Sequence, residues 1–328
     1  SKEATNTTIV GDLAGQYTTG SNNTFMGYSA GKGGTTSAPY SSGTSNVAVG
    51  AYAFDGFTTG AGNVAIGYNT AGSSTTPTGL TAVGAYALDA NTGGYEVVAI
   101  GYHALGAETY AGHATAVGYS ALEDQNSAAN SYNTAVGSQV GRNITSGKNH
   151  TLMGYRAGQT MTTTAETVLI GSEAGYAINS TDANGTVAIG YQAGKAITSG
   201  QRNVLMGYQA GLSMTTMDDT VAIGYGAGDA LSTGTGRNTI IGGAAASDLT
   251  TESQNVAIGS SALGGATGAS NVIAIGHRAA QSLSHGDSSG TVAIGVLALE
   301  NANGAHARNL AIGYYAGNAI TTGGSNTA

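Results

Sequence analysis

The side chains that could carry acid–base or metal chemistry are few in this sequence. Its 328 residues contain ten Lys and Arg, 18 Asp and Glu, six His and no Cys. No His is spaced from a second His or from a carboxylate as metal ligands usually are, and the absence of Cys excludes disulfides and thiolate sites. We therefore predict no metal site and no catalytic histidine. The histidines are His103, His113, His150, His277, His285 and His306.

Acidic residues adjoin each other at two places, Glu123–Asp124 and Asp218–Asp219. Both pairs fall between short apolar runs, where solvated turn residues are the usual explanation, and a weakly held cation is the alternative. The glycine–aspartate nonapeptide of calcium-binding β-rolls is absent. Because no carboxylate pair stands out, we predict that the chain is not an enzyme. A glycan depolymerase with its carboxylates in a groove remains the enzymatic alternative.

Three short matches to cofactor and nucleophile motifs are best explained by the abundance of glycine. The stretch 60–65 fits a dinucleotide-binding pattern, but a strand follows it where that motif requires a helix. The stretch 27–32 is one residue too short for a phosphate-binding loop, and its Ser29 lacks the helix that a nucleophile elbow requires. We predict no cofactor.

A tandem repeat organises the whole sequence. The stretch TVAIGYQAG, residues 186–194, recurs in edited form, and each copy has a short apolar run that ends at a glycine, which we call the anchor glycine. There are 18 copies, and ten of the 17 intervals between anchors are 17 residues long. No linker divides the copies, so we predict one repeat array over residues 1–328.

Three positions around the anchor are nearly as regular as the glycine. Asn stands four residues before it in eight copies, Tyr directly after it in nine, and Ala three residues after it in 16. Stacked copies would turn these positions into ladders of identical side chains. We predict a structural ladder represented by Gly67, Gly101, Gly190, Gly224, Tyr68, Tyr191, Tyr208, Ala193, Asn63 and Asn203.

The repeat predicts an all-β fold, a parallel β-solenoid of about 18 coils. The run Val-Ala-Ile is too short for a helix, and β-branched residues bounded by Gly, Asn and Thr are typical of a short strand. The run is apolar throughout, so we expect both of its faces to be buried. We expect Val187 and Ile189 to fill the coil interior, and Ala188 and Gly190 to face a second chain. One coil cannot bury enough surface to stand alone, so stability must come from stacking.

The repeated Asn/Thr-Val-Ala-Ile-Gly, with Ala three residues on, resembles the head repeats of the YadA-like trimeric autotransporter adhesins, and related repeats occur in phage tail-fibre proteins. The resemblance covers essentially the whole chain. It implies a left-handed β-roll, a side-by-side homotrimer and exposure on a cell surface or virion. By position, strands such as 64–67, 187–190 and 221–224 would line the trimer interior.

Composition and repetition together favour a structural function. The net charge of −8 argues against nucleic-acid or anionic-membrane binding, and no apolar run reaches the roughly 18 residues of a membrane span. We predict an extracellular fibre or adhesin shaft whose loops attach to a host-surface glycan or protein. The alternative is a structural filament that polymerises head to tail through its end coils and has no ligand.

Two surface functions stay open beside these. The Tyr ladder is either a buried or half-buried packing stack or an exposed aromatic row that could stack on sugars. Thr-rich segments such as 58–60 raise an ice-binding alternative, which we disfavour because the Thr positions look irregular between copies.

Overall fold

The computed structural model describes residues 5–35, 39–110, 112–283, 289–302, 308–321 and 323–328. The chain forms two compact units, Ser1–Ala165 and Glu166–Ala328. His285 and His306 lie outside the described residues. One short 3-10 helix, η1 (Thr181–Ala183), interrupts the strands of the second unit. No helix in the described part of the chain has the length and apolar character of a membrane span.

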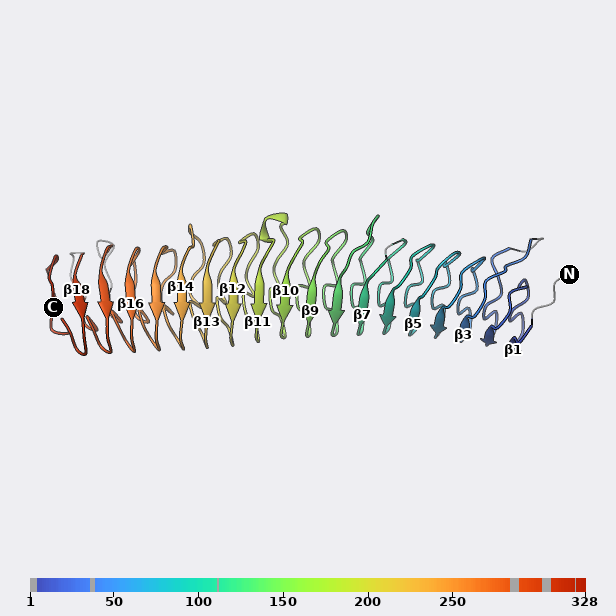
Figure 1. The fold of residues 1–328 in the computed structure, drawn as a ribbon, viewed down its shortest axis with the longest axis horizontal. Helices are drawn as coiled ribbons and strands as arrows, with labels where there is room; N and C mark the ends of the chain where they lie inside the picture. The colour runs from blue at the N-terminus through green and yellow to red at the C-terminus, as the bar shows by residue number, and fades with distance from the viewer. Residues whose placement is uncertain (1–4, 36–38, 111, 284–288, 303–307, 322) are drawn as a thin grey trace. The chain divides into compact units, whose positions relative to one another are not determined.

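Among the described residues, each unit contributes nine strands of three residues. Figure 1 draws these strands as arrows. The first unit holds β1 (Thr8–Val10), β2 (Thr24–Met26), β3 (Val47–Val49), β4 (Val64–Ile66), β5 (Thr81–Val83), β6 (Val98–Ile100), β7 (Thr115–Val117), β8 (Thr134–Val136) and β9 (Thr151–Met153). The second holds β10 (Val168–Ile170), β11 (Val187–Ile189), β12 (Val204–Met206), β13 (Val221–Ile223), β14 (Thr239–Ile241), β15 (Val256–Ile258), β16 (Ile273–Ile275), β17 (Val292–Ile294) and β18 (Leu310–Ile312).

Consecutive strands within each unit pair in parallel and in register, one coil per strand. For example, Val187 pairs with Val204 and Ile189 pairs with Met206. A repeat of about 17 residues therefore brings the same position of successive copies side by side, which confirms the predicted all-β fold of 18 parallel strands in a β-solenoid.

Each strand is short because its anchor glycine turns the backbone. Gly190 has φ +134°, a conformation that residues with a Cβ rarely adopt. A tight turn follows, in which the amide of Ala193 donates to the carbonyl of Gly190 at 3.3 Å. Two further residues of the corner, Gln192 and Gly194, have left-handed conformations with φ +55° and +57°. The chain thus reverses direction within a few residues, and the next strand then pairs with the one before it.

The predicted orientation of the strand side chains was wrong. Ala188, in the middle of β11, is fully buried in the coil interior, whereas Val187 and Ile189 on either side are only half-buried on the outer face. The other strands share this pattern, except β1, which is exposed throughout. The expectation that both faces would be buried therefore fails within a single chain.

Side-chain sizes inside the coils differ from one copy to the next. In the coil of β6 the middle strand residue is Ala99, and a buried Leu105 stands four residues after the anchor, whereas in the coil of β11 Ala188 is combined with Gly194. Where the strand carries Leu205, that position is Gly211, and a methyl group there would lie 3.0 Å from the leucine side chain. The interior is thus packed by alternative combinations of small and large residues.

Part of the interior of the first unit is polar. Ser74, Asn91, Glu108 and Gln125 stand seven residues after successive anchors, and all four are fully buried. Gln125 Nε2 donates to the Glu108 carboxylate at 3.1 Å, and the amide of Tyr110 donates to the same carboxylate at 3.0 Å. In the second unit, apolar residues such as Ile178, Ile197 and Met214 fill this position. The buried carboxyl group of Glu108 is satisfied by hydrogen bonds, as burial of a polar group requires.

Candidate functional site

The outer face of the strands carries no charge and is apolar apart from the threonines that begin seven strands. It is formed by the first and third residues of each strand, and none of these 36 positions carries a charged side chain. The third residue is always Val, Ile or Met, and several of these side chains are well exposed, with 38% for Ile66 and 48% for Met153. The face of a sheet that meets only water usually carries polar residues. This surface is therefore a candidate contact region.

The anchor glycines closely approach the next coil of the same chain, a contact that by itself requires a residue without a side chain. A methyl group on Gly190 would lie 2.3 Å from the carbonyl oxygen of Gly207. The other three ladder glycines are as crowded, because each would place a methyl group 2.2–2.7 Å from the anchor one coil later; they are Gly67, Gly101 and Gly224. Ala193 lies fully buried in the interior beside this corner.

The Asn positions form a buried ladder that holds the backbone before each strand. Asn203 Nδ2 donates to the carbonyl of Met217 at 2.7 Å, and its Oδ1 accepts from the amide of Thr220 at 2.9 Å. Asn63 makes the equivalent bonds to Pro77 and Leu80. The amides mainly satisfy backbone groups of the next coil, and some also bond to one another, as Asn63 Nδ2 does to Asn46 Oδ1 at 3.0 Å.

His150 replaces Asn in this ladder, a role that the sequence reasoning missed. It stands four residues before the anchor Gly154 and is almost fully buried. Its Nε2 lies 2.8 Å from the carbonyl oxygen of Thr164, 14 residues on, which is the spacing that the asparagine bonds have. A carbonyl oxygen only accepts, so Nε2 carries a proton. Burial lowers the pKa of His150 to about 4. Its place in the Asn slot was the clue in the sequence.

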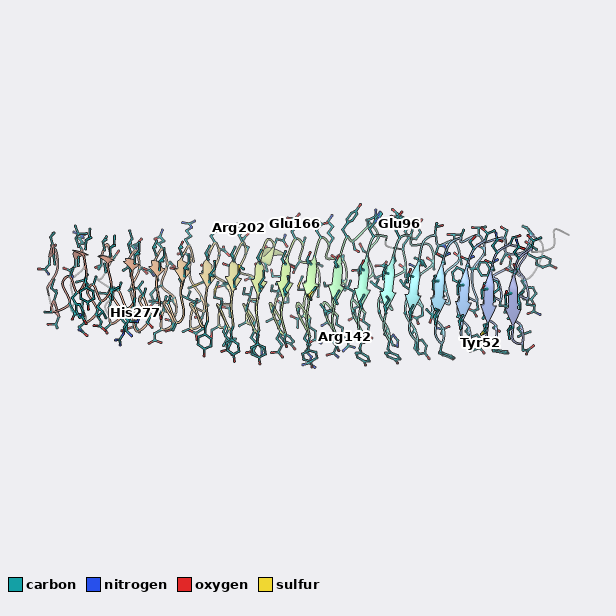
Figure 2. The ribbon with its side chains drawn as sticks, turned by 60° about the horizontal axis from the view of Figure 1, so that its bottom comes forward. Tyr52, Glu96, Arg142, Glu166, Arg202 and His277 are labelled. Carbon is teal, nitrogen blue, oxygen red and sulfur yellow. The ribbon has the colours of Figure 1, made fainter. Side chains whose placement is uncertain are left out.

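The Tyr positions form an exposed aromatic ladder where the strands end. Figure 2 labels Tyr52 on this edge of the first unit, and Glu96 on the opposite edge. Tyr68 is 48% exposed, and Tyr191 and Tyr208 are similarly open. The rings of Tyr191 and Tyr208 stack with centroids 5.1 Å apart. The ladder therefore packs ring against ring and also presents aromatic surface to solvent.

Threonine forms a ladder that is regular, so the prediction of irregular Thr positions was wrong. Thr58 Oγ1 donates to the carbonyl of Thr75 at 2.9 Å, and Thr75 Oγ1 donates to that of Thr92 at 2.8 Å. In the second unit Thr198 and Thr215 are linked in the same way. These hydroxyl protons are used between coils, so they are not free to order water as an ice-binding face requires.

The acidic pairs mainly bridge neighbouring coils. Arg142 Nε lies 2.7 Å from the Glu123 carboxylate, and Arg202 Nε lies 2.6 Å from that of Asp219. The Arg202 hydrogen bond lowers the pKa of Asp219. Within the residues that the structure describes, no three His, Asp or Glu side chains are arranged to hold a metal ion.

Ionisable side chains also come together at His113 and in a groove of the second unit. His113 Nδ1 lies 3.0 Å from Glu96, one coil earlier, a contact that the sequence reasoning did not anticipate.

The groove in the second unit has a volume of about 530 Å³ and is wide open to solvent. Partial burial raises the pKa of Asp229 in this groove. It is lined by Leu212, Ser213, Asp229, Ala230, Ala244, Ser247 and Asp248.

Compared with protein-family models, the sequence matches none, and a comparison with curated proteins likewise finds no match.

Proposed function

We propose that this chain is the shaft of a homotrimeric fibre displayed on a cell surface or virion, with no catalytic activity. The observation that supports it is the charge-free outer face of the strands, which one chain leaves half-exposed. Large exposed apolar surfaces are typical of interaction sites. Three copies packed side by side would cover this face on each of them.

The repetition of this face favours self-association over a small ligand. Every strand from β1 to β18 carries Val, Ile or Met at its third position, so each coil offers the same contact. An interface built from one repeated unit gains area with each added coil. The left-handed β-roll implied by the resemblance to YadA-like heads belongs to this proposal, and the loops between strands are the expected attachment sites for a host or matrix surface.

The experiment that tests the fibre proposal is the mass of the purified chain by light scattering. We expect three times the 32.1 kDa of one chain. A double variant, Ile66→Lys with Ile100→Lys, places charge on the outer face of β4 and β6 and should shift the mass to that of one chain, because burying unpaired charges is costly. Circular dichroism should stay unchanged, since both side chains face outward.

The matched control is Tyr110→Lys, which adds a charge at an exposed residue outside the strands and should leave the trimer intact. A wild-type chain that is strictly monomeric at all concentrations would contradict the proposal. Regular filaments of the isolated chain in electron micrographs would instead favour head-to-tail polymerisation.

A further inference from the structure

Four consecutive corners of the first unit, those that follow β3, β4, β5 and β6, repeat with a period of two coils, twice the period of the strands. After β3 and β5 the chain reads Gly-Ala-Tyr-Ala-Phe/Leu-Asp, residues 50–55 and 84–89. After β4 and β6 it reads Gly-Tyr-Asn/His-Thr/Ala-Ala/Leu-Gly, residues 67–72 and 101–106. The two forms alternate over these four corners, so the same Tyr and Asp positions are found again 34 residues later.

The alternation sets the orientation of the aromatic rings. Tyr52 and Tyr86 stand two residues after their anchors, while Tyr28, Tyr68 and Tyr102 stand one residue after theirs. Neighbouring rings along this row are 5.3–6.0 Å apart and meet at 74–87°. Neighbouring rings therefore meet edge to face. Most of the row is open to solvent, since Tyr28, Tyr68 and Tyr102 are 44–48% exposed and Tyr52 is 36% exposed, while Tyr86 is half-buried.

A carboxylate and, on the next coil, a glycine lie beside each pair of neighbouring tyrosines. Asp55 lies beside Gly72 of the next coil, where a methyl group would be 3.5 Å from its Oδ1 and 2.6 Å from Oδ1 of Asn69. Asp89 lies in the same way beside Gly106, where the corresponding distances are 3.6 Å to its Oδ1 and 3.2 Å to Nδ1 of His103. Both carboxylates are half-buried, and the loss of water raises the pKa of each.

We propose that this row of corners in the first unit is a binding site for an extended, β-linked polysaccharide without anionic groups, which advances by one disaccharide unit for every two coils. Two strand spacings amount to about 9.6 Å, and each sugar residue of an extended β-linked chain advances by about one strand spacing. The tyrosine rings provide apolar faces for the sugar rings. Asp55 and Asp89 provide hydrogen-bond acceptors for sugar hydroxyls.

The charge of the site favours a neutral polysaccharide over other linear polymers. Single-stranded nucleic acids also stack on aromatic rows, but they need basic side chains along the backbone path. Here the charged side chains that repeat beside the rings are Asp55 and Asp89, which would repel phosphate or uronate groups. The basic side chains near them, Lys32 and His103, each occur at one corner only. The site therefore selects neutral glycans or glycans with amino groups.

This inference goes beyond the fibre proposal, in which recognition lies in the loops. The aromatic row lies at the strand ends, and it is complete within one chain. Binding therefore does not require the trimer. Light scattering on the same samples separates the two proposals, because a trimer that binds no glycan contradicts only this one, and a monomer that binds glycan contradicts only the fibre.

The test is calorimetric titration of the full chain with cellohexaose, with chitohexaose and with an alginate oligomer of similar length. We expect at least one of the two neutral hexasaccharides to bind, more tightly than its disaccharide, and alginate not to bind. The double variant Tyr52→Asn with Tyr86→Asn should weaken that binding by about tenfold. Asn suits these left-handed positions, because Asn69 occupies the same slot with φ +50°.

Two further variants complete the test. Tyr110→Asn removes a tyrosine that is 60% exposed outside the row and should bind like the wild type. Tyr52→Phe with Tyr86→Phe keeps the rings and should retain most of the affinity. The proposal is overturned if neither neutral glycan binds, if the double Asn variant binds as tightly as the wild type, or if alginate binds as well as the neutral chains.

Discussion

Gly190 and Gly194 lie in the same corner, but the structure predicts that they tolerate substitution by alanine to different degrees. At Gly190 the obstacle to a side chain is a backbone carbonyl, that of Gly207, and the φ of +134° is itself strained for alanine. At Gly194 the obstacles are the tips of Leu205 and Ile197, and φ is +57°. Ala71 occupies the equivalent position of another coil with φ +50°.

We therefore expect Gly190→Ala to destabilise the protein by roughly 3 kcal/mol or more and Gly194→Ala by about 1–2 kcal/mol. The difference arises because side-chain tips can move and a paired backbone cannot. Urea unfolding followed by circular dichroism measures both values. Equal losses for the two variants would show that backbone crowding at the anchor is not what requires glycine.

His150 should make the stability depend on pH in a defined window. Its folded pKa of about 4 lies below the unfolded value of about 6.5, so the unfolded chain binds the proton more readily. Stability from this residue is complete above pH 6.5 and is lost as the pH falls toward 4, by up to about 3 kcal/mol. Urea unfolding at a series of pH values between 4 and 7 measures this loss.

The variant His150→Asn supplies the control for this window. Asn makes the same bond to the carbonyl 14 residues on at other coils, as Asn133 does to Gly147 at 2.9 Å. The variant should fold and lose most of the pH dependence between 6.5 and 4. If wild type and variant show the same loss on acidification, the carboxylates and not His150 govern the response.

At the scale of the strand and its corner, the structure indicates that two interior positions exchange volume. Ala99 and Leu105 are both fully buried in the coil of β6, while Leu205 lies beside Gly211 in that of β12. We expect Leu105→Gly alone to cost about 2–5 kcal/mol through the cavity that it leaves, and Ala99→Leu alone to cost about 1–3 kcal/mol through overpacking.

The two changes together should cost less than their sum by at least about 1 kcal/mol, because the new leucine fills the space that the old one vacated. Unfolding of the wild type, both single variants and the double variant gives this coupling energy. A strictly additive double variant would mean that the two positions do not share one interior space. The glycine is compatible with the backbone, since Leu105 already has φ +52°.

At the scale of the whole molecule, the repeat places different chemistry on different sides of every coil. The outer strand face is mostly apolar and free of charge, whereas the strand ends carry exposed Tyr and the interior carries Ala and Leu. Since each column recurs at the same position, a weak contact at one coil is multiplied along the array. This multiplication is the physical basis for both proposals, the trimeric fibre and the glycan-binding row.

Much of the fold could be predicted from the sequence, because a stacked coil demands the same residue type at the same position of each copy. The anchor glycines located the end of every strand, and the eight asparagines located the buried ladder before it. The candidate surfaces were predicted less well. The Tyr column was found, but the two-coil alternation that includes Asp55 and Asp89 was not, because it lies in pairs of copies and not in single ones.

What the sequence by itself determined was the period, the strands and the parity of their side chains. Alternation along Val187-Ala188-Ile189 puts Val and Ile on one face and Ala on the other, but it does not say which face is inside. The tertiary structure decided this, because the corner residues that follow each anchor, such as Ala193 and Ile197, already occupy the interior. Only one side chain per strand fits beside them, so the two larger ones face outward.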